Sequence, residues 1–159
     1  MWIGLLKKKV EKTMKSTLYL GFKGYNNSSE ILVNSLPGQH SLLTNSFTGL
    51  KKDIDNLIED YEEVYLFGVD KSLSDSFRIE QYAEKEGKQL ATMLDINEIV
   101  NRLSASGIKC TVSKKVTHYF CNEAYWYLLE KYNGRAVLIH IPTIKHFPDI
   151  SPLVFLEKE

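Results

Sequence analysis

The sequence predicts an α/β fold, a three-layer α/β/α sandwich with a mostly parallel sheet. Segments rich in strand formers alternate with segments of helical periodicity along most of the chain, the order that builds parallel sheets covered by helices. Residues 62–69 (EEVYLFGV) and 135–142 (RAVLIHIP) are nearly continuous apolar runs, as required of strands buried on both faces. The length of 159 residues and the 43% hydrophobic content suit one domain with its own core. We therefore expect a single α/β domain over residues 15–159, preceded by an N-terminal extension at residues 1–14.

Each element of this fold has a local signal. Residues 16–22 (STLYLGF) are rich in strand formers and stop at a run of turn and cap residues, KGYNNSS. Ser28 or Ser29 is expected to cap a short helix, which the following Pro-Gly pair ends. The other predicted strands are 40–47, 62–69, 108–113 and 135–142, and the other predicted helices begin at Thr48, follow a cap at Asp95, or span 121–132. Residues 77–83 (FRIEQYA) are consistent with either a short extended segment or the start of a helix.

Composition argues against several classes of function. The 20 basic and 20 acidic residues cancel and form no basic stripe, so we expect no nucleic-acid partner. No apolar run approaches the roughly 18 residues that span a membrane, so no membrane partner is expected either. Two cysteines, Cys110 and Cys121, are too few for a disulfide scaffold and indicate a reducing, cytoplasmic setting. The spacing of His118 from these cysteines fits no structural zinc pattern, so no metal site is expected.

Three residues far apart in the sequence are predicted to meet at one edge of the sheet. Functional residues of such sheets gather beyond the carboxyl ends of the strands. Cys121 follows a predicted strand and begins a helix, and His140 lies near the carboxyl end of the last strand. Glu80 lies past the end of strand 62–69. A thiol, an imidazole and a carboxylate are therefore expected at one rim.

The chemistry of these three side chains suits nucleophilic catalysis. Unpaired N–H groups at the start of a helix favour a thiolate at Cys121. The His140 imidazole would strengthen that effect and protonate a leaving amine, and the Glu80 carboxylate would fix the tautomer of the imidazole. The N–H groups of the helix start would also stabilise an oxyanion, an interaction worth about 3 kcal/mol.

Each residue also has a purely structural interpretation. A cysteine with apolar neighbours usually packs in a core, and a histidine within LIHIP is usually a hydrogen-bonded core residue. Glu80 taken alone is typical of a solvated surface charge. Arg78 is expected to pair with a surface carboxylate, and the aromatic residues around Cys121 are expected in the core or at an oligomer contact.

Residues 117–129 (THYFCNEAYWYLL), followed by AVLIHIP at 136–142, resemble the cysteine and histidine motifs of the pyroglutamyl peptidase I (pyrrolidone-carboxylate peptidase) family. That family carries an aromatic-x-Cys-Asn signature that opens a helix and an Ile-His-x-Pro strand end. Residues 66–83 (LFGVDKSLSDSFRIEQYA) are similar to its Gly-rich strand end and to the stretch with its catalytic glutamate. Residues 18–36 (LYLGFKGYNNSSEILVNSL) are similar to its opening strand, pocket loop and helix start. The resemblance covers roughly residues 16–147.

This resemblance implies an α/β/α sandwich and a cysteine peptidase that removes an N-terminal pyroglutamyl residue from a peptide or small amide substrate. By the resemblance, Cys121 would attack the amide carbonyl, His140 would shuttle the proton and Glu80 would orient the imidazole. The positions that fall in the substrate pocket of the family are Phe22, Tyr25 and Asn27. Aromatic walls there would bury the flat lactam ring at little desolvation cost. The family needs no metal or other cofactor and tends to form homo-oligomers.

The sequence departs from the family pattern around the pocket. Residues 84–93 (EKEGKQLATM) stand where the family has an Asp-Ala-Arg-Ile-Pro-like stretch, and Arg78 is a candidate replacement for the arginine of that stretch. The pocket loop lacks its proline, and Tyr25 replaces its second Phe. These departures leave two alternatives open. One is a catalytically inactive α/β domain derived from the family that acts as a binding or assembly module, and the other is an amide hydrolase with a different substrate.

Overall fold

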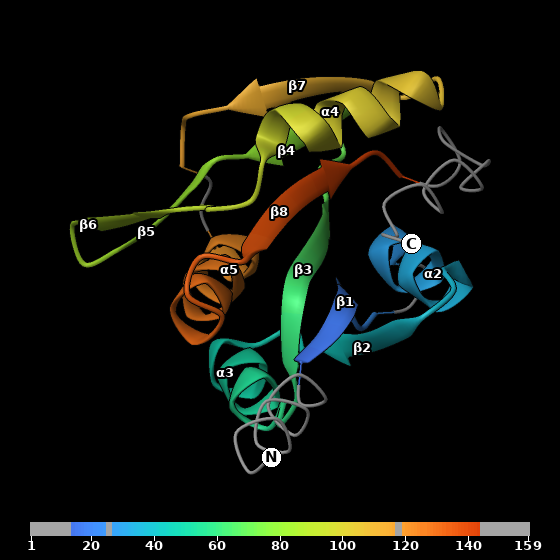
Figure 1. The fold of residues 1–159 in the computed structure, drawn as a ribbon. Coiled ribbons are helices and arrows are strands. Elements are labelled where there is room, and N and C mark those ends of the chain that lie inside the picture. Colours follow the sequence, from blue (N-terminus) through green and yellow to red (C-terminus); the bar gives the residue numbers. More distant parts are fainter. Residues whose placement is uncertain (1–13, 25–26, 117–118, 144–159) are drawn as a thin grey trace, which may run out of the picture.

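A six-stranded sheet forms the centre of the computed structural model, which describes residues 14–24, 27–116 and 119–143. In sheet order the strands are β2 (Gln39–Leu43), β1 (Met14–Phe22), β3 (Asp60–Val69), β8 (Ala136–Ile141), β4 (Ser76–Glu80) and β7 (Lys109–Ser113), as Figure 1 shows. β2, β1, β3 and β8 are parallel to one another, whereas β4 is antiparallel to β8 and parallel to β7. The prediction of an α/β fold with a mostly parallel sheet is confirmed.

Helices cover both faces of this sheet and give the molecule three layers (Figure 1). α3 (Phe47–Asp55) and α5 (Tyr119–Lys131) pack on one face, and α2 (Ser28–Ser35) and α4 (Ile96–Ala105) pack on the other. Successive side chains of a strand point to opposite faces, so Leu66 joins the core under α3 and α5 while Phe67 joins the core under α2 and α4. The predicted sandwich therefore has two cores, and the candidate site belongs to the face of α3 and α5.

The helix starts follow from short side chains that cap the free N–H groups. Asp95 caps α4 by accepting from the backbone N–H of Glu98, as predicted. Asn27 rather than Ser28 or Ser29 caps α2, because the Ser29 hydroxyl is used elsewhere: it donates to Asn27 and accepts from a β1 backbone N–H. The cap therefore lies one or two residues earlier than predicted.

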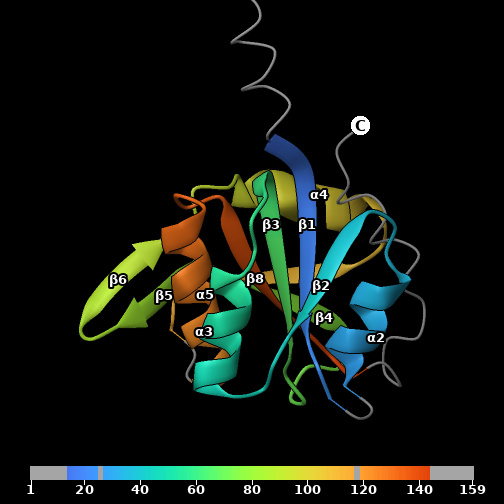
Figure 2. The ribbon, with the colours of Figure 1, turned by 90° about the horizontal axis from the view of Figure 1, so that it is seen from below.

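A two-stranded hairpin of β5 (Tyr82–Lys85) and β6 (Lys88–Ala91) extends from the body beside α5 (Figure 2). The sequence did not predict it, because its turn is Glu-Gly rather than the Asn-Gly or Asp-Gly pair that marks most two-residue hairpin turns. Both Glu86 and Gly87 have positive φ, 52° and 76°, as a type I′ turn requires. The hairpin occupies most of residues 84–93, the stretch that departs from the family pattern.

β1 begins at Met14, so the sheet reaches the last residue of the predicted N-terminal extension, and residues 1–13 lie outside the described residues. Within the described part of the chain, no helix has the length and apolar character needed to cross a membrane.

Candidate active site

Cys121 and His140 lie on either side of a glycine in the centre of the sheet. Cys121 is in the first turn of α5, and His140 is the penultimate residue of β8, where it pairs in register with Gly68 of β3. A Cβ atom placed on Gly68 would lie 2.6 Å from Sγ of Cys121 and 3.3 Å from Nε2 of His140. The sulfur and this ring nitrogen therefore border the same small space, which exists because residue 68 has no side chain.

Glu80 reaches His140 from a neighbouring strand. Its Oε1 lies 2.9 Å from Nδ1 of His140, and the two residues are only 1% and 5% exposed. The interpretation of Glu80 as a solvated surface charge is wrong. Glu80 is the last residue of β4, so the extended alternative predicted for residues 77–83 holds at this position. β4 runs antiparallel to β8 and places Glu80 opposite Leu138, two residues before His140.

The shorter of two polar contacts to Nδ1 indicates which ring nitrogen of His140 is a base. An ionised carboxylate only accepts hydrogen bonds, so with Glu80 ionised the 2.9 Å contact is a hydrogen bond in the tautomer that carries its proton on Nδ1. Nε2 then keeps its lone pair on the side of the thiol. The Tyr125 hydroxyl of α5 donates to the backbone carbonyl of Glu80 at 2.8 Å, which ties the end of β4 to the helix that carries Cys121.

Burial raises the pKa of the Cys121 thiol to about 12, and the carboxylates of Glu80 and Asp70 act in the same direction. This shift opposes the thiolate that the helix start favours. Cys121 can act as a nucleophile only if a base accepts its proton during attack, and Nε2 of His140 is the nearby base.

A pocket of about 960 Å³ opens in front of Cys121 and His140. Phe22, at the end of β1, and Asn27, at the cap of α2, are two of the predicted pocket residues, and both line it. Tyr25, the third, lies outside the described residues. Phe120 of α5 adds an aromatic wall that the sequence interpretation did not assign. The pocket thus combines the thiol and imidazole with aromatic walls and with the charged side chains of Asp70, Lys71 and Arg78.

Hydrogen bonds fix the wall formed by β1 and α2. The Ser29 backbone N–H and hydroxyl donate to Oδ1 of Asn27 at 2.9 and 2.7 Å. The Ser29 hydroxyl oxygen in turn accepts from the backbone N–H of Phe22 at 3.0 Å. Because each group has a partner, Phe22 and Asn27 are held in place before any ligand binds.

Two further residues of the site were not recognised from the sequence. Gly68 had a usable signal, since a glycine inside a buried strand often marks a close approach by another group. Asn122 follows the nucleophile, and its side chain bonds both the N–H and the C=O of Glu84 at 2.9 and 2.8 Å, which no local pattern reveals. Among the described residues, no three His, Cys, Asp or Glu side chains are grouped as a metal site requires, and His118 lies outside them.

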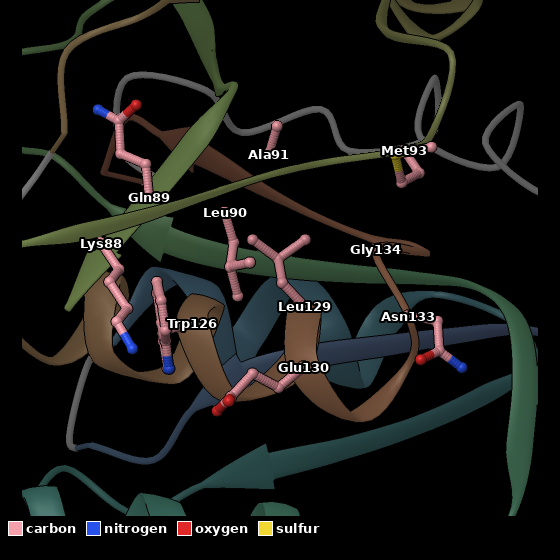
Figure 3. Close-up of a pocket in the computed structure, with 10 residues that line it drawn as sticks. All are labelled: Lys88, Gln89, Leu90, Ala91, Met93, Trp126, Leu129, Glu130, Asn133 and Gly134. Carbon is pink, nitrogen blue, oxygen red and sulfur yellow. The ribbon is translucent and has the colours of Figure 1, made fainter.

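A second hollow of about 900 Å³ lies between the hairpin and α5. Figure 3 shows Leu90 of β6 beside Leu129 and Trp126 of α5. Its lining includes none of Cys121, His140 or Glu80, so this hollow is separate from the candidate active site.

Replacing Gly68 with alanine is expected to disturb the site directly. The new methyl group would lie 2.6 Å from Sγ, so Cys121 must move away from His140. Overpacking of this kind costs about 1–3 kcal/mol of unfolding free energy, and we expect the rate of Cys121 alkylation by iodoacetamide to change as well. Urea denaturation and mass spectrometry measure the two effects.

Gly49→Ala is the matched control, since its Cβ would lie 2.5 Å from Oγ of Ser46. Gly49→Ala should lose stability and leave the rate of Cys121 alkylation unchanged. A changed alkylation rate in both variants, or in neither, would contradict the placement of Gly68 beside Cys121.

Known structures share this fold. The chain is similar to a pyroglutamyl peptidase I from Bacillus amyloliquefaciens, with a TM-score of 0.70 and 18% identity over 89% of this chain and 92% of the other. A mutant pyrrolidone carboxyl peptidase from Pyrococcus furiosus gives a TM-score of 0.72 and 18% identity over 89% and 96% of the two chains. The pyrrolidone carboxyl peptidase from Thermus thermophilus gives a TM-score of 0.67 and 17% identity over 79% of this chain and 84% of the other. No protein-family model and no curated protein matches the sequence. At these identities the similarity establishes the fold.

Proposed function

We propose that this protein is a cysteine peptidase or amidase of the pyroglutamyl peptidase I family, with Cys121, His140 and Glu80 as its catalytic triad. The observation that carries this proposal is the meeting of the Cys121 thiol and the His140 imidazole at Gly68, beside one pocket, with the Glu80 carboxylate in contact with the other ring nitrogen of His140. The fold, shared with solved pyroglutamyl peptidases, supports the assignment. Fold alone does not imply activity, so the geometry of the three groups is the stronger argument.

In the proposed reaction, Sγ of Cys121 attacks the amide carbonyl carbon while Nε2 of His140 takes the thiol proton. The carbonyl π electrons move to oxygen, where N–H groups at the start of α5 stabilise the charge. The C–N bond then breaks, and the leaving nitrogen takes the proton from Nε2. Water attacks the resulting thioester with His140 again as base, and the departing sulfur recovers its proton. Glu80 stays ionised throughout and stabilises the imidazolium.

The pocket favours a flat, uncharged acyl group. Phe22 and Phe120 present aromatic surface close to the thiol, which suits a lactam ring such as pyroglutamate. A peptide or small amide with an N-terminal pyroglutamyl residue is therefore the proposed substrate. No cofactor takes part in the proposed steps.

A second candidate function is a catalytically inactive binding or assembly module. It is favoured by one observation, the partial burial of Cys121, which raises the pKa of its thiol to about 12. A neutral thiol at such a position is also what a packing cysteine has. The two functions differ in whether His140 can remove the proton when an amide is in place.

A fluorogenic pyroglutamyl amide tests the proposal. We expect wild-type protein to release the fluorophore and His140→Ala to lose the activity about 10³-fold or more, as loss of a catalytic base does in Ser and Cys hydrolases. His40→Ala is the matched control, because His40 is exposed on β2 and should not affect turnover. Other N-blocked amides in the same assay measure specificity. Turnover of these but not of the pyroglutamyl amide would support an amide hydrolase with another substrate, and no turnover of any amide would support the binding module.

A further inference from the structure

Arg78 lies at the junction of the carboxylate and the imidazole. Its Nε donates to Oε1 of Glu80 at 2.6 Å, the same oxygen that contacts Nδ1 of His140. Its Nη2 lies 3.4 Å from that Nδ1 and 2.8 Å from Oδ2 of Asp70. Arg78 therefore contacts the triad itself, and its expected pairing with a surface carboxylate describes only part of its role.

The sheet requires this placement. Arg78 and His140 are directly opposite each other in the antiparallel pair of β4 and β8, so their side chains are neighbours on one face. Glu80, two residues along β4, shares that face. The register of β4 and β8 therefore places the charge of Arg78 next to His140.

A buried carboxylate needs a counter-charge. Glu80 is 1% exposed, and its Oε2 has no hydrogen-bond partner among the described residues. A neutral imidazole gives Glu80 one hydrogen bond and no positive charge, so at rest Arg78 is the cation that contacts the carboxylate. Without such a partner, burial drives an acid toward its neutral form.

We propose that Arg78, held in place by Asp70, is a positioning residue that keeps Glu80 ionised and thereby selects the Nδ1–H tautomer of His140. A neutral Glu80 would carry the proton shared with His140 and donate it to Nδ1. Nε2 would then hold the ring proton and face the Cys121 thiol as a donor, unable to act as a base. This inference rests on the proposed function, because the tautomer matters only if His140 activates Cys121.

Asp70 competes with His140 for Nη2 of Arg78. If Nη2 donated to Nδ1, the ring would again be forced into the Nε2–H tautomer. The 2.8 Å ion pair with Asp70 holds Nη2 at 3.4 Å from Nδ1, a longer contact than the 2.9 Å bond between Glu80 and Nδ1. Asp70 is itself fixed by hydrogen bonds of 2.9 and 2.6 Å from the Ser72 backbone N–H and hydroxyl. Although burial opposes it, the hydrogen bonds from Ser72 and Arg78 lower the pKa of Asp70 to about 2, so this carboxylate stays charged.

The tautomer can be measured without a substrate. Long-range ¹H–¹⁵N correlation spectra at about pH 8, above the ordinary imidazole pKa of about 6.5, show which ring nitrogen is protonated, and His140→Ala assigns the signal. We expect Nδ1–H in the wild type, a large Nε2–H fraction in Arg78→Met, and recovery of Nδ1–H in Arg78→Lys, which keeps the charge. A folded Arg78→Met protein with an unchanged Nδ1–H tautomer would overturn the proposal. If Arg78→Met fails to fold, Asp70→Asn provides the test. An unchanged Nδ1–H tautomer in Asp70→Asn would also overturn the proposal.

Kinetics give an independent readout. Arg78→Met should lower kcat by about tenfold to 10⁴-fold, the upper figure being the cost of a wrong tautomer in related triads, with a smaller change in KM. Adding Arg78→Met to Glu80→Gln should cost little more, because Arg78 acts through Glu80. Arg102→Met is the control, since Arg102 pairs with Glu98 on α4. A wild-type protein without amidase activity but with an Arg78-dependent tautomer would refute the proposed function alone, and an active Arg78→Met enzyme with full kcat would refute this inference alone.

Discussion

Replacing Cys121 with alanine is expected to abolish amide hydrolysis and leave the fold intact. In the proposed mechanism the sulfur forms the bond to the acyl group, and no other described cysteine can take its place. Cys110 lies on β7 at the edge of the sheet, packed against the core under α2 and α4. Loss of a triad nucleophile typically costs about 10⁴-fold or more in kcat. The side chain is small, so we expect the unfolding free energy to change by about 1 kcal/mol. Turnover of the pyroglutamyl amide and urea denaturation measure the two effects.

Cys110→Ala is the matched control for this experiment. It removes the other free thiol from a half-buried position and should leave kcat unchanged. The reverse pattern, with activity lost in Cys110→Ala and kept in Cys121→Ala, would remove Cys121 from the mechanism.

The pH dependence of alkylation gives a further check. Because burial raises the pKa of Cys121 to about 12, its reaction with iodoacetamide should keep accelerating well above the ordinary thiol pKa of about 8.5.

Glu80→Gln is expected to lower kcat by about 10³- to 10⁴-fold with little change in KM. Glutamine keeps the shape of the side chain but removes the charge that stabilises the imidazolium and holds the proton on Nδ1 of His140. KM should be nearly constant, because Glu80 does not line the described pocket. Stability should fall by about 1–3 kcal/mol, since Arg78 loses one partner but keeps Asp70. Steady-state kinetics with the pyroglutamyl amide and urea denaturation measure the two effects.

Glu63→Gln is the control for the loss of a buried carboxylate. Glu63 is 7% exposed on β3, and its Oε2 accepts from the Tyr65 hydroxyl at 3.0 Å. We expect a loss of stability and no loss of kcat. If Glu63→Gln reduced kcat as much as Glu80→Gln, the effect at Glu80 would be one of stability rather than catalysis.

The fold and two site residues were accessible from the sequence because their signals are local or follow from topology. Apolar runs marked the central strands, and a cysteine at a helix start and a histidine at a strand end are positions that a parallel sheet brings to one rim. Glu80 was expected beside Cys121 and His140, on a segment consistent with a strand or a helix start, and it lies on β4. Its approach depends on β4 being antiparallel to β8, and nothing in a short segment such as FRIEQYA specifies its direction relative to a strand some 60 residues later.

Other parts of the site could not be predicted, because they depend on distant pairings or on burial. A thiolate at Cys121 was expected from the helix start and the His140 imidazole, whereas burial and two carboxylates act against the charged form. Arg78 had the sequence signature of a surface residue, and its contact with His140 appears only when β4 and β8 are paired in register. The hairpin was missed because Glu86 adopts a positive φ that side chains other than Gly, Asn and Asp rarely take.

The two hydrogen bonds between Asn122 and the backbone of Glu84 restrict how a tetrahedral intermediate can be stabilised. The side-chain amide of Asn122, the residue after Cys121, is hydrogen-bonded to the hairpin. It is therefore not available to the negative oxygen that would form during attack. In the proposed mechanism, peptide N–H groups at the start of α5 stabilise that oxygen. Asn122→Ala should therefore leave oxyanion stabilisation intact, and replacing one peptide bond near Cys121 with an ester by chemical synthesis is the direct way to weaken it.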